Sequence, residues 1–337
     1  MKNIEINNLF DILACPISNS SLEVASEAGN KFLKNDNNKY LIKEGVPILM
    51  SDNNYAEKDI KFKNSIQNFW NSGWDKRSKE NDHDFLYDLT HDEFFNRIKK
   101  NYEHQQSRGL GIGGYQSNEL KMENLKDKIS LIIGPGCGEE AMEINLLTKS
   151  KVIGVDISFN SAFLTNKLFK NFDSNSGLGI QGDSRFLPIK SNSIDFVFSH
   201  GVIHHSPNIS QSIDEIHRVL KPKGFFCVGL YNKYGLVWIK FLLYAYIKGN
   251  WSLKKLEKYV SSQTEKAWIT EGKINPYTKL FTKSECEEML KLFNNVKVRT
   301  GNFKTPNNLL LKFLKLFENS KFLSKFGSMN YISGTKI

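Results

Sequence analysis

The feature that most constrains the fold is an apolar run ending in a glycine-rich turn, ISLIIGPGCGEEA, at residues 129–141. The apolar part predicts a buried parallel strand, and helix-forming residues with apolar positions at helical spacing follow from Glu139 to Leu147. Glycines let the backbone come close to a ligand, and the start of a helix offers unpaired N–H groups. The turn is therefore a candidate site for a ligand with a polar or charged end.

An alternation of strands and helices continues beyond this turn. Further strands are predicted at 151–158, 179–184, 193–199 and 225–230, with helices at 160–172 and 209–220. This order predicts a doubly wound parallel sheet whose ligand lies outside the carboxyl ends of the strands. Asp156 ends one strand about 20 residues past the glycines, where nucleotide-binding α/β folds present a carboxylate to ribose hydroxyls.

The composition of the 337 residues is ordinary for a globular protein, with 40% hydrophobic and 24% charged residues. The net charge of +10 would suit RNA or a membrane surface, but the chain has no block of five or six like charges. The four cysteines form no CxxC pair, so neither a disulfide framework nor a zinc site is indicated. The chain starts without a signal-peptide pattern and has no apolar run of about 18 residues, so we expect a cytoplasmic protein.

Residues 1–52 are expected to form a small unit, with short strands at 31–34 and 39–42 around an Asn/Asp turn. The start Leu13-x-Cys15-Pro16 and the end motif YLIKEGVPIL resemble the zinc-ribbon-like module that serves as an activator or N-terminal domain of methyltransferases, including those acting on tRNA. Ser18 stands where a second cysteine belongs in that module. Because structural zinc sites need about four N or S ligands, we expect this module to hold no metal.

Residues 53–120 are polar with interleaved aromatic residues. Phe62, Ile66 and Phe69 have the spacing of an amphipathic helix, and we expect a helical linker that wraps the core rather than binds a ligand. The loop at 109–115 is glycine-rich, but no Lys-Ser/Thr of a P-loop follows it.

The C-terminal part departs from the alternating pattern at Gly235. An apolar stretch at 236–247 is too short to span a bilayer and predicts a lid within an insertion at about 235–275. A helix after Thr282, with Glu285 completing a capping box, is followed by predicted strands at 296–298 and 331–334, the last antiparallel. Apolar residues broken by lysines at 309–326 predict a helix that either packs on the lid or lies on an acidic membrane surface.

Five motifs in order, from residue 129 to about 230, resemble those of class I S-adenosylmethionine-dependent methyltransferases of the type 11 kind. They are Gly134-x-Gly136-x-Gly138, Gly154-Val155-Asp156, Gly182-Asp183-Ser184-x-x-x-Leu187-Pro188, Ser193-x-Asp195-Phe196-Val197 with Val202-Ile203-His204-His205, and Arg218-Val219-Leu220-Lys221-Pro222-Lys223-Gly224. The resemblance implies a Rossmann-like sheet of seven mostly parallel strands with a small N-terminal α+β module and a helical lid. It implies a methyltransferase activity with S-adenosylmethionine as the cofactor.

The resemblance also implies roles for individual residues. Residues expected at the cofactor are Gly134, Pro135, Gly136, Gly138, Asp156, Ile157, Asp183, Ser184, Ser199 and His200. Among them, Asp156 would bind the ribose hydroxyls, Asp183 the adenine amino group, and Ser184 would border the base. Many family members carry an acid where this chain has Ile132, so the methionine amino group would need another partner here.

Catalysis would need little more than alignment of the methyl group with its acceptor and exclusion of water. If the acceptor is a hydroxyl, a base is useful; the candidates are His200, His204 and His205, of which we expect His205 to be structural. Tyr231 ends the fifth strand on the ligand side and completes the candidate catalytic set of His200, His204 and Tyr231.

The sequence does not identify the methyl acceptor, although the aromatic, apolar lid favours a small or lipid-like molecule. A nicotinamide or flavin Rossmann domain would also fit Gly136-x-Gly138-x-x-Ala141, but it does not explain the Asp183 motif or the His-His segment. An RNA methyltransferase and an inactive methyltransferase-like partner protein remain alternatives. A peripheral membrane contact remains open, and the oligomeric state is not indicated.

Overall fold

The computed structural model describes residues 9–79, 89–108, 113, 125–172, 175–249, 253–265, 274–301 and 325–337. Its helices and strands in chain order are η1 (Phe10–Ile12), β1 (Glu23–Glu27), β2 (Asn30–Lys34), β3 (Lys39–Lys43), β4 (Val46–Pro47), η2 (Asp52–Asn54), α1 (Glu57–Lys79), α3 (His91–Arg108), β5 (Ile129–Ile133), α5 (Glu139–Thr148), β6 (Lys151–Asp156), α6 (Phe159–Asn171), β7 (Gly177–Gln181), β8 (Ile194–His200), η4 (Ile203–His205), α7 (Ile209–Val219), β9 (Leu220–Tyr231), α8 (Leu236–Ile247), α9 (Leu253–Gln263), α10 (Lys283–Met289), β10 (Phe293–Gly301) and β11 (Met329–Lys336). The predicted loop at 109–115, apart from Gly113, and almost all of the predicted helix at 309–326 lie outside the described residues.

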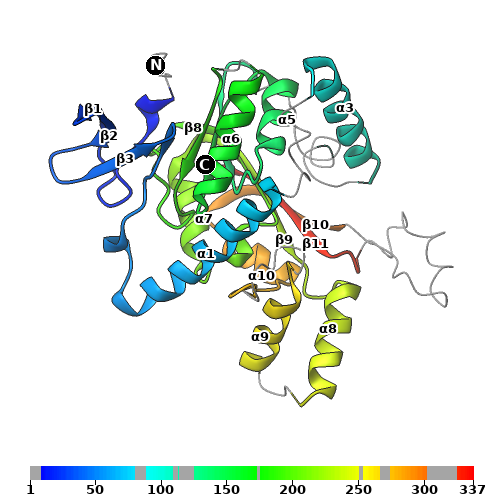
Figure 1. Ribbon diagram of the computed structural model, residues 1–337. Helices are drawn as coiled ribbons and strands as arrows, with labels where there is room; N and C mark the ends of the chain where they lie inside the picture. Colours follow the sequence, from blue (N-terminus) through cyan, green and yellow to red (C-terminus); the bar gives the residue numbers. More distant parts are fainter. Residues whose placement is uncertain are drawn as a thin grey trace.

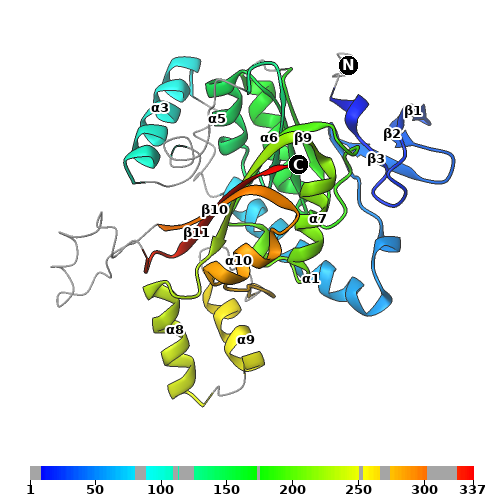
Figure 2. The same cartoon turned by 180° about the vertical axis from the view of Figure 1, so that it is seen from behind.

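The central sheet has seven strands in the order β10-β11-β9-β8-β5-β6-β7. Strands β5 to β9 pair in parallel, and β11 runs antiparallel between β9 and β10. Figure 2 shows β10 and β11 together beside β9. The chain moves outward from β5 to β7 and then returns to β8, so the strand order reverses between β5 and β8. This is the Rossmann-like methyltransferase sheet, and it confirms the predicted fold class.

Helices cover both faces of the sheet because side chains alternate along each strand. In β5, Leu131 and Ile133 belong to the apolar cluster that includes α7 and α10, whereas Ile132 belongs to the cluster with α5 and α6. The apolar run at the start of this segment is therefore buried on both faces, as parallel strands between helices require.

Side-chain caps begin the helices that flank the sheet. Ser158 accepts a hydrogen bond from the backbone N–H of Ser161 at the start of α6, and Asn208 caps α7 in the same way. The predicted capping box at Thr282 and Glu285 is confirmed at the start of α10.

The N-terminal module contains the antiparallel sheet β1-β2-β3-β4, with the predicted strands at 31–34 and 39–42 present as β2 and β3. It attaches to the edge strand of the central sheet, where Leu49 N–H donates to the Gln181 carbonyl at 2.9 Å. Leu13, Leu33 and Leu49 share one apolar cluster with the central sheet. Among the residues described, no group of three or more His, Cys, Asp or Glu is arranged to hold a metal ion.

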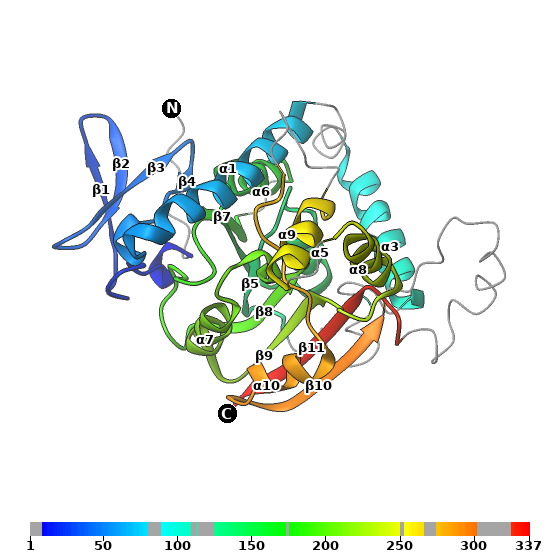
Figure 3. The ribbon, with the colours of Figure 1, turned by 90° about the horizontal axis from the view of Figure 1, so that it is seen from below.

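Two further helical parts surround the sheet. Helix α1 runs alongside α6, and α3 lies on the side of the sheet domain opposite the N-terminal module (Figures 1 and 3). Helices α8 and α9 contact each other and project from the body as a hairpin (Figure 1). In the described part of the chain, no helix is both long enough and apolar enough to cross a membrane.

Candidate active site

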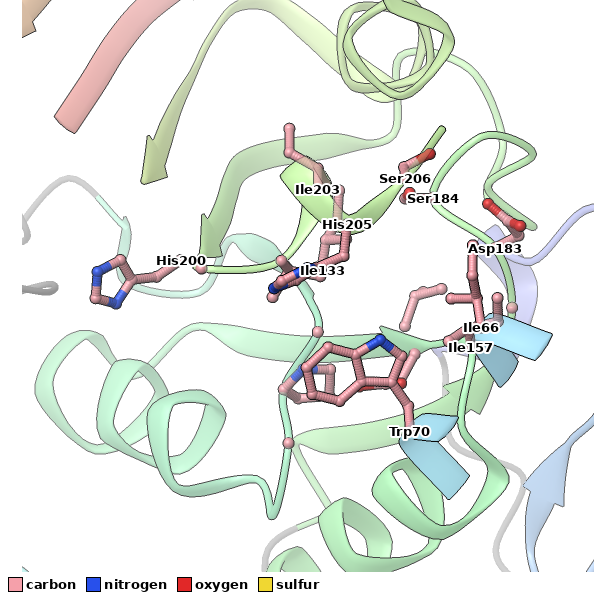
Figure 4. Close-up of a pocket in the computed structure, with 18 of the residues that line it drawn as sticks. Ile66, Trp70, Ile133, Ile157, Asp183, Ser184, His200, Ile203, His205 and Ser206 are labelled. Carbon is pink, nitrogen blue, oxygen red and sulfur yellow. The ribbon is translucent and has the colours of Figure 1, made fainter. Parts of the chain in front are cut away.

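A cavity of about 340 Å³ lies at the carboxyl ends of the central strands, next to the point where the strand order reverses. Its wall combines the loops after β5, β6, β7 and β8 with Ile66, Trp70 and Trp74 from α1 and with Tyr231 and Glu265 from the C-terminal part. Figure 4 shows Trp70 of α1 facing the strand-end residues across this cavity. The cavity therefore lies where the alternation of strands and helices predicts a ligand.

The glycine turn forms one part of the wall through Gly134, Pro135 and Gly136. Gly134 has a φ of 75° and Gly136 a φ of 62°, and residues that carry a side chain rarely adopt such positive φ values. A Cβ on Gly134 would lie 2.3 Å from Val202, and one on Gly136 would lie 2.7 Å from the Trp74 indole. Glycine is required here because the turn is covered closely from both sides.

Gly138 and Ile132, two other residues near the turn, do not line the cavity. Gly138 has a φ of 88° and serves as the N-cap of α5, so its role is to start the helix. Ile132 is fully buried against α5 and α6. It therefore offers no polar contact to a ligand.

Asp156 ends β6 in the cavity wall. Its Oδ1 accepts a hydrogen bond from Ser158 N–H at 2.8 Å, and its Oδ2 accepts one from Ser161 Oγ at 2.7 Å. Burial raises the pKa of this carboxyl to about 6, against the opposing effect of these hydrogen bonds and one from Gly136 N–H. Ile157, the next residue, also lines the cavity. The carboxylate is held in place but keeps acceptor capacity toward the cavity.

Asp183 lies in the wall, but its carboxylate is already held by neighbouring donors. Arg185 binds both oxygens at 2.6–3.2 Å, and the Tyr55 hydroxyl donates to Oδ2 at 2.8 Å. Any adenine amino group would have to share these oxygens. Ser184 also lines the cavity, with its Oγ 2.9 Å from Ser212 Oγ.

The residues at the end of β8 divide into wall and core. His200 lines the cavity, and its Nδ1 lies 3.5 Å from Glu140 Oε1. Ser199 is fully buried, lies outside the wall, and its Oγ has no hydrogen-bond partner among the described atoms. Of these two predicted cofactor residues, the structure places only His200 where it can touch a ligand.

The histidine pair of η4 is divided in the same way. His205 lines the cavity, with its ring 5.2 Å from that of Trp70, whereas His204 does not line it. His204 is fully buried, its ring lies 4.0 Å from that of Tyr231, and burial holds its pKa well below the usual value. His205, which we expected to be structural, therefore lies in the cavity wall, and His204 lies in the core.

Tyr231, at the end of β9, and Glu265, which follows α9, form another part of the cavity wall. The Tyr231 hydroxyl donates to Glu265 Oε1 at 2.5 Å, and burial followed by this carboxylate raises the pKa of Tyr231 well above its usual value. Tyr231 is therefore a hydrogen-bond donor at neutral pH. Glu265 Oε1 also lies 3.9 Å from His205 Nε2.

Helix α1 is fixed over the cavity by polar contacts as well as by its tryptophans. Asn71 Oδ1 accepts from Ser158 Oγ at 2.8 Å and from Asn160 N–H at 3.2 Å, and Asn160 Nδ2 donates to the Asn71 carbonyl at 3.1 Å. These contacts join α1 to the loop that follows Asp156. The segment that we expected only to wrap the core therefore also forms part of the cavity wall.

Several wall residues did not stand out in the sequence, namely Ile66, Trp70, Trp74, Glu139, Glu140, Arg185, Ser206 and Glu265. The aromatic residues of α1 have the spacing of any amphipathic helix, so their pattern does not separate packing from ligand contact. Of these residues, Arg185 could have been identified from the sequence, because it directly follows the Gly182-Asp183-Ser184 motif, two residues after Asp183.

Parts of the chain are similar to known methyltransferases. Residues 131–228 match the family model of a methyltransferase domain. Over 208 residues the chain is 26% identical to sterol 24-C-methyltransferase ERG6 of Saccharomyces cerevisiae. The aligned region covers 55% of this chain and 52% of that protein. Over 141 residues it is 30% identical to phosphoethanolamine N-methyltransferase 2 of Caenorhabditis elegans, with 40% and 32% covered.

The chain is also similar to proteins that are named for a different activity. The human mitochondrial arginine-hydroxylase NDUFAF5 is 31% identical over 104 residues, which cover 31% of this chain and 29% of that protein. Among solved structures, a SAM-dependent methyltransferase from Thermotoga maritima has a TM-score of 0.46 at 18% identity, covering 80% of this chain and all of that one. The chain spans about half or less of the length of these curated relatives, and residues 131–228 are the part that matches the model of a methyltransferase domain.

Proposed function

We propose that the chain is an S-adenosylmethionine-dependent methyltransferase that transfers a methyl group to a hydroxyl, amine or carbon of a small or lipid-like acceptor. The observation that carries this proposal is the convergence of the Gly134–Gly136 turn, Asp156 and Asp183 on one cavity. They come from three successive strand ends, the arrangement in which an α/β sheet binds a nucleoside. The family match over residues 131–228 supports the same activity.

The wall fits the cofactor chemically. The close-packed glycine turn brings backbone groups against the cavity, and the Asp156 carboxylate can accept from two ribose hydroxyls. S-adenosylmethionine supplies, when bound, a methyl group on a positively charged sulfur. Since Ile132 is buried in the core, we propose that Glu140, at the start of α5 beside His200, binds the methionine amino group instead.

The protein's contribution is alignment of the acceptor and exclusion of water. Trp70 and Trp74 cover the cavity from α1, so a ligand beneath them is shielded from solvent. Of the candidate catalytic residues, His200 and Tyr231 lie in the wall, where they can touch an acceptor. His204 would act only through its packing on Tyr231.

The acceptor class is supported by the relatives, which act on sterols and phosphoethanolamine according to their names. The similarity to an arginine-hydroxylase suggests hydroxylation as a second candidate function. In that case the fold and the proposed nucleoside site of this chain would serve a different reaction. Transfer of a methyl label distinguishes the two activities.

We also propose that the N-terminal module is a zinc-ribbon-like unit that no longer uses metal. Cys15 Sγ lies 3.1 Å from the Tyr40 hydroxyl, so a protein side chain occupies the space beside the sulfur. The module's apolar side chains join the main core, which supports a structural role.

The first test is calorimetric titration of the full chain with S-adenosylhomocysteine. We expect micromolar binding that an Asp156→Ala variant loses, because the ribose contact disappears. Incubation with methyl-labelled S-adenosylmethionine and cell extract should then label a small-molecule fraction. Absence of S-adenosylhomocysteine binding by the wild-type chain would overturn the proposal, and label found in RNA would overturn the acceptor class.

A further inference from the structure

One part of the cavity wall is formed by His205, whose Nε2 has no hydrogen-bond partner among the described residues. His205 is 4% exposed, and its Nε2 is buried. Its Nδ1 lies 3.0 Å from the Tyr277 carbonyl oxygen and 2.9 Å from Thr278 Oγ1. A buried polar atom in a cavity wall is a position where a ligand can supply the missing partner.

The neighbouring hydrogen bonds decide which nitrogen of His205 carries the proton. Asn275 Nδ2 lies 3.3 Å from Nδ1, but its two hydrogens serve shorter bonds to Thr264 Oγ1 at 2.9 Å and Thr278 Oγ1 at 2.7 Å. The Tyr277 carbonyl can only accept, so Nδ1 donates and Nε2 keeps its lone pair. Burial also lowers the pKa of His205, which favours the neutral ring.

The wall of the cavity as a whole is acidic, and one of its carboxylates, that of Glu265, contacts His205. The carboxyl groups of the wall are those of Glu139, Glu140, Asp156, Asp183 and Glu265. Among the described residues of the wall, the one Lys or Arg is Arg185, which is bound to Asp183. Glu265 accepts from the neutral Tyr231 hydroxyl, and its contact with His205 Nε2 at 3.9 Å is too long for a hydrogen bond. Within the described chain, Glu265 therefore has no cationic side chain as a partner.

Aromatic faces adjoin the same place. The rings of Trp70 and Tyr231 lie 5.2 Å and 5.9 Å from that of His205. A cation over an indole or phenol ring is attracted by the ring, most strongly when it is desolvated. A carboxylate, two aromatic rings and an unprotonated nitrogen together suit a ligand that carries both positive charge and a removable proton.

We propose that the methyl acceptor is an amine that binds as its ammonium ion beside Glu265 and Trp70, and that His205 Nε2 removes one of its protons. This inference rests on the proposed methyltransferase function and names its acceptor class. The acceptor nitrogen gives a proton to His205, and its freed lone pair forms the bond to the methyl carbon while the carbon–sulfur bond breaks with its electron pair left on sulfur. The products are a neutral thioether, a methylated ammonium ion and a protonated His205, which returns its proton to solvent.

The binding test uses the full chain loaded with S-adenosylhomocysteine. Its probes are benzylammonium, phenethylammonium and phenyltrimethylammonium, with benzyl alcohol and phenethyl alcohol as neutral counterparts. We expect the ammonium ions to bind at least about tenfold more tightly than the alcohols, because a charged hydrogen-bond pair adds to the aromatic contact. Glu265→Gln still accepts from Tyr231 but removes the charge, and it should abolish this preference.

The controls separate this inference from the proposed function. Glu287→Gln, on the exposed side of α10, should bind the ammonium ions and the alcohols like the wild-type chain. The wild-type chain, Glu265→Gln and Glu287→Gln should all bind S-adenosylhomocysteine equally. Equal binding of alcohols and ammonium ions, failure of every ammonium ion to bind, or an unchanged preference in Glu265→Gln would each overturn the inference while leaving the function in place. Failure to bind S-adenosylhomocysteine would overturn the function and the inference with it.

The role of His205 has its own readout in the ¹⁵N resonances of the histidine rings, assigned with a His205→Asn variant. The titratable groups around its ring are Glu265, Tyr231 and His204. We expect Nε2 to be unprotonated at pH 7, and the pKa of His205 to fall further in Glu265→Gln, since the carboxylate raises it. A proton found on Nε2, or a pKa that does not respond to Glu265→Gln, would exclude His205 as the base. His217→Asn, a histidine outside the wall, should leave the signal unchanged.

Discussion

The two halves of the cavity are built in different ways. The half that we propose binds the cofactor, the cofactor half, comes from the glycine turn, Asp156 and Asp183, which follow three strands of one sheet within about 50 residues of chain. The half that we propose binds the acceptor, the acceptor half, combines side chains from α1, η4, the end of β9 and the residue Glu265, which are distant in sequence. Hydrogen bonds such as those of Asn71 and Tyr231 hold these segments together, in place of a sheet.

This difference separates what the fold fixes from what it leaves variable. Strand ends in a shared sheet are positioned by backbone pairing, so the cofactor half is set once the sheet forms. A helix and an insertion outside the sheet can be exchanged without altering that half. We therefore expect substitutions in the two halves to have separable effects, and the predictions below test that separation.

The largest effect is expected from Asp156→Ala, which removes the carboxylate of the cofactor half. Loss of a buried charged hydrogen-bond acceptor should weaken S-adenosylhomocysteine binding by about 100-fold, measured by calorimetry. The ammonium probes should still bind the variant in the absence of cofactor. Asp214→Ala, an exposed acid on α7, is the control. A variant that lost both ligands together would show that the two halves are not separable.

The same difference explains how far the sequence could be interpreted. Alternating strands and helices, together with a glycine turn and Asp156, indicated the sheet and the cofactor half because each signal is local in the chain. The acceptor half depends on tertiary contacts that no local pattern encodes. Trp70 has the spacing of a packing residue, and Glu265 carries no motif at all. The pair His204 and His205 shows the limit clearly, since adjacent identical residues face a core and a cavity.

A second prediction concerns the helix behind the cofactor half. Glu143 of α5 is fully buried, Gln105 Nε2 donates to it at 3.4 Å, and its Oε1 has no partner among the described atoms. Burial raises its pKa from 4.5 to about 8. The folded chain therefore favours the protonated carboxyl. The contribution of Glu143 to the free energy of unfolding is greatest below pH 4.5 and is lost as the pH rises through about 8.

Glu143→Gln should therefore raise the free energy of unfolding by about 4 kcal/mol more at pH 9 than at pH 5, since each unit of the pKa difference corresponds to about 1.4 kcal/mol. Urea denaturation at the two pH values measures this, with Glu103→Gln on the exposed face of α3 as the control. Cofactor affinity should not change in either variant. An equal gain at both pH values would mean that Glu143 is not protonated in the folded chain.

A third prediction concerns the joint between the halves. Asn71→Ala removes the side-chain acceptor that joins α1 to Ser158 and Asn160, next to Asp156. We expect S-adenosylhomocysteine affinity to fall about tenfold, which corresponds to one or two lost hydrogen bonds. Hydrogen exchange in α1 should also become faster. Asn68→Ala, on the exposed face of the same helix, should change neither quantity. If Asn71→Ala left affinity intact, α1 would belong to the acceptor half alone.

The smallest effect is a pH dependence that belongs to the cofactor half. The Asp156 carboxyl has a pKa raised to about 6 by burial, and in our proposal ribose hydroxyls donate to its ionised form. Protonation competes with the ligand, so affinity for S-adenosylhomocysteine should be constant above pH 7 and fall roughly fourfold at pH 5.5. Asp156→Asn cannot titrate and should show weak binding without this dependence. A wild-type profile that stayed flat to pH 5 would mean that Asp156 does not contact the ribose, and the cofactor half would then depend on the glycine turn and Glu140 for its affinity.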